Sequence, residues 1–255
     1  MQYWHLNPDY SSKRAGELFA TLDSTFSAAG VQITKDRLSR VFRVEVPGEC
    51  YYVKRYLGGG KSAKRRWFGL RALIGRQRIK REWENLLAFR RWGLPAADIV
   101  AYGLERRWGA FVRGGMVTAE IANTVDLAQM AADHDPRLNN RRWVSAVSVQ
   151  VARIARKMHD HGFAHNDFKW RNLLVEQGDD PVVHLIDCPC GSYWWWPFLE
   201  YRKIKDLACL DKLAKYHLTR TQRLRFYHDY AGAERLSSKD KHRIAKIVHF
   251  FDGRE

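Results

Sequence analysis

The sequence predicts an α+β protein of two lobes, in which an antiparallel sheet with one helix is followed by a mainly helical part. Two observations predict this fold class. Strand patterns and turn signals fill the first part of the chain, whereas helical periodicity dominates from about residue 120 onwards. In addition, a chain of 255 residues with 45% hydrophobic residues is long and apolar enough to bury a core in each lobe. We therefore expect an N-terminal lobe over residues 1–119 and a C-terminal lobe over residues 120–255.

The N-terminal lobe begins with a stretch over residues 12–28 that we expect to be helical. Two runs rich in β-branched and aromatic residues then flank a Pro-Gly-Glu turn, namely RVFRVEV (40–46) and CYYVKRY (50–56). This pattern predicts two strands joined by a tight turn. The later runs ADIVAYGLE and GAFVRGGMVTAEI predict two more strands of the same lobe.

Helices are predicted where apolar residues recur every three or four positions. REWENLLAFRRWG (81–93) has this spacing and ends on a glycine, as amphipathic helices often do. The strongest helical pattern is RRWVSAVSVQVARIARKMHDHGF (141–163), which Gly162 ends. From about Tyr201 onwards the pattern is again helical.

The charge of the chain points to a polyanionic partner. Lys and Arg number 44 against 28 Asp and Glu, which gives a formal net charge of +16. Nucleic acid, an anionic membrane surface and a polyanionic substrate would each fit such a charge. The four cysteines are spaced too irregularly for a zinc site and indicate reduced thiols in a cytosolic protein. We expect neither a signal peptide nor a membrane-spanning stretch, so the protein should be soluble or lie on a surface.

A cluster of polar residues, HNDFKWRN (165–172), stands before the apolar run LLV, and a second apolar run, VVHLID (182–187), ends on an acid. Phosphoryl transfer needs a carboxylate near the acceptor hydroxyl, side-chain oxygens that hold magnesium, and cations on the phosphates. An acid and an asparagine five residues apart on one loop, with a second acid at the end of the paired strand, can meet these needs. The layout is that of a protein-kinase-like catalytic loop.

Each position of this layout has an expected role. Asp167 would be the catalytic base, and Lys169 would contact the transferred phosphoryl group. Asn172 and Asp187 would be the magnesium ligands, while His165 would pack behind the loop and hold its shape. Any one of these residues alone would more simply be a surface or capping residue, so the prediction rests on their order and spacing.

The N-terminal lobe offers residues for the nucleotide. Lys54, in the strand YYVKRY, stands where the lysine for the α- and β-phosphates should be. Glu82 is the helix glutamate that we expect to pair with it, and Glu84 is the fallback.

The remaining nucleotide contacts depart from the usual kinase pattern. No G-x-G-x-x-G loop is present, because KDRLSRVFRV (35–44) occupies its place. The phosphate contacts would then come from backbone N–H groups and from Ser39 or Arg40. In the segment TAEIAN, the carbonyl of Glu120 and the amide of Ala122 would bind adenine.

These motifs together resemble the lipopolysaccharide core kinases, the Kdo/heptose kinase family of Gram-negative bacteria. The resemblance extends over residues 35–215 and is carried by YYVKRYLGGG, REWENLLAFRRWGLPAADIVAYG, MHDHGFAHNDFKWRNLLV and HLIDCP. It implies a protein-kinase-like fold, ATP and Mg²⁺ as cofactors, and lipid A-core oligosaccharide as substrate, phosphorylated on a hydroxyl of an inner-core heptose or Kdo. By the same resemblance, Asp206 matches the acid that holds the catalytic loop from a helix.

The acceptor is expected to be a sugar or another small molecule. Only 18 residues separate Asp187 from Asp206. In protein kinases a longer interval holds the activation segment and a platform for peptides, for which this chain has little room.

Two segments are candidates for contact with the substrate or its membrane. The basic stretch 58–81 holds nine Lys and Arg and no acid from residue 61 onwards, and it could steer lipid A-core and hold the protein at an anionic membrane surface. A solvated charged face is the alternative. Three consecutive tryptophans are expected to line a sugar-binding wall, with bilayer contact or core packing as alternatives: Trp194, Trp195 and Trp196.

Other functions remain open at this point. Within enzymes, the rivals are another small-molecule kinase and a RIO-like protein kinase. From a different class, a basic nucleic-acid-binding protein would explain the charge but would leave the ordered catalytic residues as coincidence, so we expect no nucleic-acid partner. We also expect a cytoplasmic protein that lies peripherally at the inner face of the inner membrane.

Overall fold

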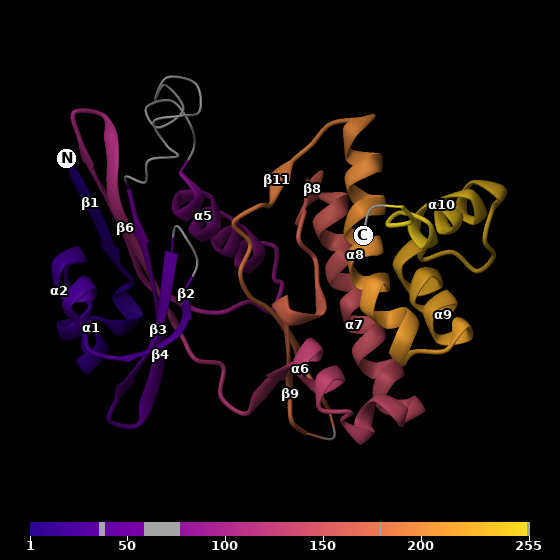
Figure 1. Ribbon diagram of the computed structural model, residues 1–255, viewed down its shortest axis with the longest axis horizontal. Helices are drawn as coiled ribbons and strands as arrows, with labels where there is room; N and C mark the ends of the chain where they lie inside the picture. Colours follow the sequence, from indigo (N-terminus) through magenta and orange to yellow (C-terminus); the bar gives the residue numbers. More distant parts are fainter. Residues whose placement is uncertain (36–38, 59–76, 179, 254–255) are drawn as a thin grey trace. The chain divides into compact units, whose positions relative to one another are not determined.

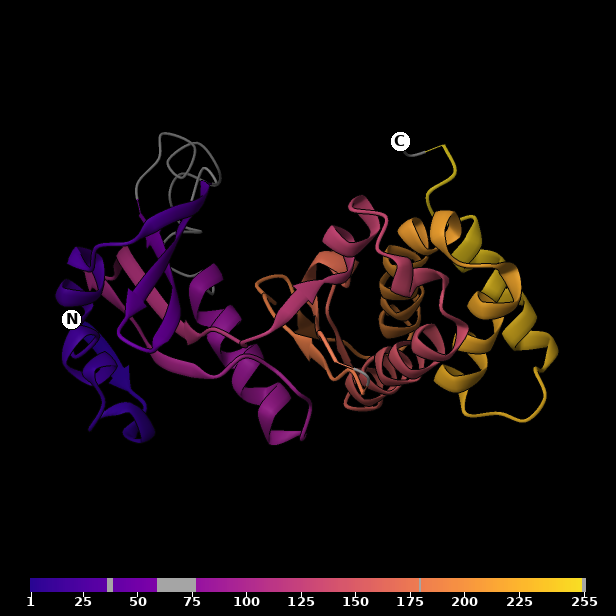
Figure 2. The same cartoon turned by 90° about the horizontal axis from the view of Figure 1, so that it is seen from below.

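The computed structural model describes residues 1–35, 39–58, 77–178 and 180–253. By their contacts, the residues form two compact units (Figure 1). The first unit comprises Met1–Leu87 and Ala97–Ile121, and the second comprises Ala88–Ala96 and Ala122–Glu255. A sheet forms most of the first unit, whereas helices predominate in the second, as a second view also shows (Figure 2).

The first unit contains a six-stranded antiparallel sheet with the strand order β1-β5-β6-β4-β3-β2. The predicted pair of strands around the Pro-Gly turn is confirmed as β3 and β4. Val46 pairs with Glu49, so the connecting loop is two residues long, and Gly48 adopts a φ of 84° that glycine reaches without strain. The strands are β1 (Gln2–Leu6), β2 (Val31–Lys35), β3 (Ser39–Val46), β4 (Glu49–Leu57), β5 (Ile99–Arg107) and β6 (Ala110–Ala119).

The two faces of this sheet carry different residues because side chains alternate along a strand. On one face, Val53 of β4 is fully buried in an apolar core with Phe19 and Val44. Lys54 and Tyr56 point to the other face, where they meet the long helix of this sheet. The helices of the sheet are η1 (Pro8–Tyr10), α1 (Arg14–Leu18), α2 (Leu22–Ser27) and α5 (Arg78–Arg91).

The stretch over residues 12–28, which was expected to be helical, forms two short helices. Thr21 interrupts it: its hydroxyl accepts a hydrogen bond from the Ser24 amide at 3.0 Å, and the Ser24 hydroxyl accepts one from the Thr21 amide. This reciprocal pair is a capping box, which starts α2 as a new helix.

The long helix predicted around residue 150 is confirmed as α7. Its N-terminus is fixed by Asn140, whose side-chain oxygen accepts hydrogen bonds from the amides of Arg142 and Trp143. Gly162 follows its C-terminus with a φ of 69°. The helices of the second unit are α6 (Leu127–Ala132), η3 (Pro136–Asn139), α7 (Arg141–Asp160), η4 (Trp170–Asn172), α8 (Phe198–His217), α9 (Arg220–Ala231) and α10 (Ser238–Val248).

The segment between α7 and α8 contains strands of two small antiparallel sheets, and one of these sheets also includes β7, which precedes α6. One has the order β10-β9-β7 and the other pairs β11 with β8. Their strands are β7 (Thr124–Asp126), β8 (Phe163–Ala164), β9 (Leu173–Glu176), β10 (Val183–Leu185) and β11 (Ser192–Tyr193).

Within the described ranges, none of the helices has the length and apolar character needed to cross a bilayer.

Candidate active site

The strand pair β9–β10 brings the two ends of the predicted catalytic segment together. Leu173 pairs with Leu185, and the backbone amide of Ile186 donates a hydrogen bond to the carbonyl of Asn172 at 3.1 Å. Asn172 and Asp187 therefore stand at the same end of one strand pair. The two apolar runs thus pair as strands, and their pairing places two oxygen-bearing residues at one end of the small sheet.

The backbone of the loop is held by Asp206 of α8, which is fully buried. One carboxylate oxygen accepts a hydrogen bond from the amide of His165 at 2.7 Å, and the other accepts one from the amide of Asn166 at 2.8 Å. Asn166 has a φ of 64°, a left-handed conformation that is uncommon for residues other than glycine but that asparagine adopts more readily than most. Asp206 thus fixes the two residues that precede Asp167.

The ring of His165 lies in the apolar interior behind the loop. It stacks on Phe89 and packs against Phe168, and it is completely buried. Neither ring nitrogen has a hydrogen-bond partner among the described residues. Burial lowers the pKa of His165, although the carboxylates of Asp206, Asp167 and Asp187 act against the shift, so the imidazole is neutral at pH 7.

The carboxylate of Asp167 is flanked by two cationic side chains. Lys169 contacts one of its carboxylate oxygens at 2.5 Å, and Arg171 contacts the other at 3.0 Å. Burial alone would raise the pKa of Asp167, but the two cations outweigh it and hold the pKa below its ordinary value. The carboxylate is therefore ionised at neutral pH and available to accept a proton.

The side chains of Asn172 and Asp187 carry oxygen atoms of the kind that magnesium prefers. Asn172 is buried, and its amide nitrogen donates to the carbonyl of Asp167 at 2.8 Å, so its amide oxygen would be the atom to meet a metal ion. Asp187 follows with a φ of 56°, again a left-handed conformation. Among the described residues, no group of three or more His, Cys, Asp or Glu could hold a metal. One amide and one carboxylate fit Mg²⁺, which usually takes its other ligands from phosphates and water.

In the first unit, Lys54 and Glu82 form a buried ion pair. The two side chains lie 2.7 Å apart, and Glu82 is almost fully buried. The hydroxyl of Tyr56 also donates to Glu82, at 2.8 Å, and burial raises the pKa of this tyrosine well above its ordinary value. Glu84 was the alternative partner expected for Lys54, and its carboxylate lies 3.9 Å from the amine of Lys80.

The other residues expected at the nucleotide lie at strand ends. Ser39 is the first residue of β3, opposite Tyr56, and its side chain is mostly buried. The Glu120 amide donates to the carbonyl of Cys50 at 2.9 Å, while its carboxylate accepts from Arg43. Among the described residues, neither the Glu120 carbonyl nor the Ala122 amide has a backbone partner. Residues 36–38 of the expected phosphate loop and 59–76 of the expected basic loop lie outside the described part of the chain.

The three tryptophans differ in their surroundings. Trp194 is half-buried, and the guanidinium of Arg202 lies 4.2 Å from the centre of its ring. The side chains of Trp195 and Trp196 are 73% and 77% exposed. Arg202 also donates to the side-chain oxygen of Asn166 at 3.2 Å, so Trp194 is linked to the catalytic loop through one side chain.

Three further residues contact the candidate site residues and were not predicted from the sequence. Tyr56 could have been found, because it stands two positions after Lys54 and therefore on the same face of β4. Arg171 could also have been found, as it lies four residues after Asp167 on the same loop. Arg202 gave no local signal, since its contact with Asn166 joins residues 36 positions apart.

The second unit has an oriented carboxylate with a cation beside it and two side chains with oxygen atoms that would suit a metal, and the first unit has a lysine held by a buried glutamate. Phosphoryl transfer needs groups of these kinds. Residues 28–243 match the lipopolysaccharide kinase (Kdo/WaaP) family. The lipopolysaccharide core heptose(I) kinase WaaP of Pseudomonas aeruginosa is 31% identical over 199 residues, which are 75% of this chain and 73% of that protein.

Among solved structures, WaaP in complex with acyl carrier protein is similar with a TM-score of 0.73. The similarity covers 97% of this chain and 95% of that chain at 24% sequence identity, which shows a shared fold. The chain therefore belongs to the lipopolysaccharide kinase (Kdo/WaaP) family and is a kinase with a protein-kinase-like fold.

Proposed function

We propose that this kinase transfers the terminal phosphoryl group of ATP to a hydroxyl of an inner-core heptose of lipopolysaccharide, with Kdo as the alternative acceptor. The catalytic loop carries the proposal: Asp167, Lys169 and Asn172 project from one loop whose backbone is fixed by buried hydrogen bonds. Phosphoryl transfer depends mainly on such positioning and on electrostatics. The similarity to a heptose(I) kinase favours heptose as the acceptor.

In this proposal Asp167 accepts the proton of the attacking hydroxyl. Its lowered pKa keeps it ionised, and its fixed position offsets its weak basicity. Lys169 and Arg171 hold its two oxygens before the acceptor arrives, so the acceptor hydroxyl has to displace at least one of them. Both side chains are partly exposed and can turn towards the phosphates.

Asn172 and Asp187 would hold magnesium, which when bound offsets the charge of the ATP phosphates. Lys54, kept in place by Glu82, would contact the α- and β-phosphates. Ser39 would lie near the phosphates. The Glu120 carbonyl and the Ala122 amide would bind adenine. Asp206 and His165 would act by positioning the loop.

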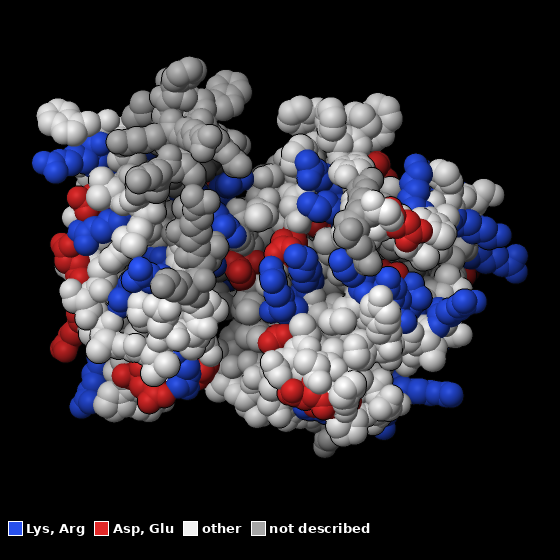
Figure 3. Space-filling view, in the orientation of Figure 1, with Lys and Arg blue, Asp and Glu red and all other residues white. Residues whose placement is uncertain are grey.

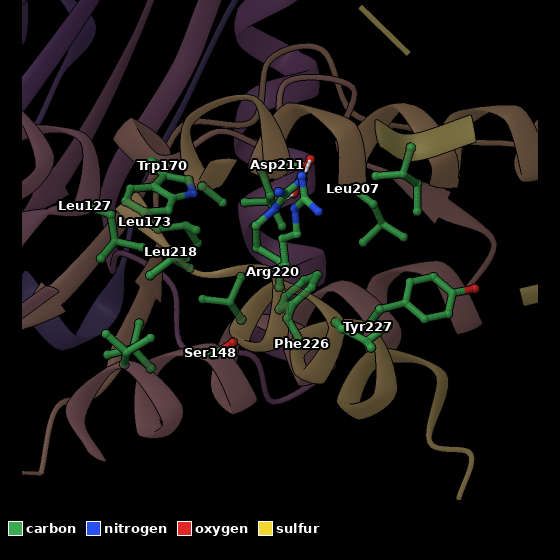
Figure 4. A pocket seen from close by; sticks show the side chains of 18 of the residues that line it. Leu127, Ser148, Trp170, Leu173, Leu207, Asp211, Leu218, Arg220, Phe226 and Tyr227 are labelled. Carbon is green, nitrogen blue, oxygen red and sulfur yellow. Dashed lines mark hydrogen bonds and ion pairs between the residues drawn. The ribbon is translucent and has the colours of Figure 1, made fainter. Parts of the chain in front are cut away.

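A cavity in the second unit supports a second proposal, which concerns a binding partner of this protein. It has a volume of about 510 Å³, within the usual range of ligand pockets. Apolar side chains from several helices and from β9 line it, among them Leu127 and Leu173 on one side and Leu207 and Phe226 on the other (Figure 4). WaaP has been solved in complex with an acyl carrier protein. We infer that the cavity takes an acyl chain and that an acyl carrier protein delivers it.

The partner can be tested by gel filtration with acylated and unacylated carrier protein. We expect the acylated form alone to bind, and we expect Val147→Trp, which fills the cavity, to abolish the binding. Equal binding of both forms would mean that the cavity does not take the chain.

The kinase proposal is tested by incubating the protein with Mg-ATP and lipid A-core that lacks core phosphates, followed by mass spectrometry. We expect one added phosphate on heptose, lost in Asp167→Asn and kept in the control Asp252→Asn, whose exposed carboxylate is at the far end of the sequence. A phosphate on Kdo would replace the heptose assignment. ATP binding without transfer to either sugar would overturn the substrate.

A further inference from the structure

A group of exposed aromatic side chains lies between β11 and the first turn of α8. Trp195 and Trp196 are the most exposed of them. The other exposed large apolar side chains in the described second unit are isolated along the chain. We call the segment 193–201 the aromatic edge; its exposed members are Tyr193, Trp195, Trp196, Phe198 and Tyr201.

The aromatic edge is fixed to the fold at both ends. Tyr193 belongs to β11 and pairs with Phe163 of β8, and the amide of Trp194 donates to the carbonyl of Gly162 at 2.8 Å. At the other end, the amide of Leu199 donates to the carbonyl of Trp195 at 3.0 Å, which leads into α8. The segment is therefore folded, with the indoles of Trp195 and Trp196 exposed. Burial of these exposed rings would release free energy, and a cluster of exposed apolar side chains indicates a surface that binds a partner.

The charge beside the aromatic edge is positive. Between residues 188 and 205 the sequence has Arg202, Lys203 and Lys205 against a single acid, Glu200. Glu200 is neutralised by Lys203 at 3.2 Å and by Arg243 at 2.6 Å. At the end of the second unit where β11 meets α8, uncharged side chains protrude and Lys or Arg side chains lie close by (Figure 3; compare Figure 1).

We propose that the aromatic edge binds the surface of an anionic phospholipid bilayer, with the indoles of Trp195 and Trp196 at the boundary between headgroups and acyl chains. Tryptophan and tyrosine are enriched at this boundary because their rings are apolar with one polar atom. Neighbouring cations add attraction to anionic lipids. The purpose of this contact rests on the proposed function, since a kinase of a lipid-linked sugar works at a membrane. The contact itself needs no catalysis.

The test uses sedimentation with vesicles that contain neither lipopolysaccharide nor ATP, so it succeeds or fails independently of the kinase assay. Vesicles of phosphatidylcholine alone are compared with vesicles that also contain phosphatidylglycerol. We expect binding to the anionic vesicles and a loss of roughly tenfold or more in the variant Trp195→Ala/Trp196→Ala. The matched control is Trp108→Ala in the first unit, whose side chain is 93% exposed and which should bind as the wild type does.

A second measurement needs no variant. Phospholipids brominated on the acyl chain quench tryptophans that enter the bilayer, so we expect quenching of the wild type and much less of the double variant. The proposal fails if the wild type does not bind, if the double variant binds equally well, or if the control loses as much binding. A double variant that keeps vesicle binding but no longer phosphorylates a lipid-free core sugar would assign the indoles to the substrate site instead.

Discussion

Asp206 offers the sharpest test of how the catalytic loop is held. Its buried carboxylate accepts hydrogen bonds from the backbone amides of His165 and Asn166, at 2.7 and 2.8 Å. One of its oxygens also lies 3.4 Å from the ring nitrogen Nε2 of His159. The change Asp206→Ala removes both acceptors and leaves two amide groups without partners. The change Asp206→Asn keeps the shape, but its NH₂ group would face one of the two donors.

The expected cost follows from these two bonds. A hydrogen bond to a charged acceptor contributes about 1.5–3 kcal/mol, so two contribute on the order of 3–6 kcal/mol. Water entering the site would recover part of this, and we expect Asp206→Ala to lose about 3–5 kcal/mol of unfolding free energy. Asp206→Asn keeps one acceptor and should lose about half as much.

Urea unfolding followed by circular dichroism measures this loss. With a slope of about 2 kcal/mol per molar urea, the midpoint should fall by about 1.5–2.5 M in Asp206→Ala. The kcat of the folded fraction should also fall, because Asp167 follows directly on the two released residues. The control is Asp160→Asn, an exposed carboxylate of the same unit that pairs only with Arg156 among the described contacts. If Asp206→Ala unfolds at the wild-type midpoint with wild-type kcat, the loop is not held in this way.

Three further perturbations address the chemistry. Lys54→Met breaks the 2.7 Å ion pair with Glu82 and should lower kcat/KM for ATP roughly 10- to 100-fold. Glu82→Gln should cause a smaller loss of kcat/KM. An unchanged kcat/KM in Lys54→Met would show that Lys54 does not belong to the nucleotide site. Arg171→Ala removes one of the two cations that lower the pKa of Asp167. The pKa of Asp167 should therefore rise, so that its carboxylate is protonated at a higher pH and the acidic limb of the plot of kcat against pH moves to higher pH. A shift to lower pH, or no shift, would contradict this. Removing Mg²⁺ with EDTA should stop phosphate transfer and weaken ATP binding measured by calorimetry, and Asp187→Ala should need more Mg²⁺ for half-maximal rate than the wild type.

Local chemistry explains which parts of the fold were predictable. β3 and β4 followed from strand composition and a Pro-Gly turn, and α7 followed from its regular apolar spacing. β1 was not predicted, because its short segment becomes a strand only by pairing with β5, about a hundred residues later. The division of residues 12–28 into two helices was not predicted, because no glycine or proline stands between them and only a capping box starts α2.

For the candidate site, too, local sequence signals predict some residues, whereas others depend on the tertiary fold. The order of Asp167, Lys169 and Asn172 is a local signal, so it could be recognised without the fold. The choice between Glu82 and Glu84 could not rest on spacing alone, because two residues apart on a helix point to nearly opposite sides. Only the packing of α5 on the sheet decides which of them meets Lys54.

Arg202 has a consequence for how variation in this protein can proceed. One guanidinium covers the ring of Trp194, at the aromatic edge, and donates to Asn166, directly before the proposed base. A substitution at Trp194 that displaces this guanidinium would therefore also alter the support of the loop, so variation at this position is coupled to the loop. With the aromatic edge on a bilayer, the lipid-bound and free forms of the kinase would differ in turnover, and not merely in how often they encounter substrate.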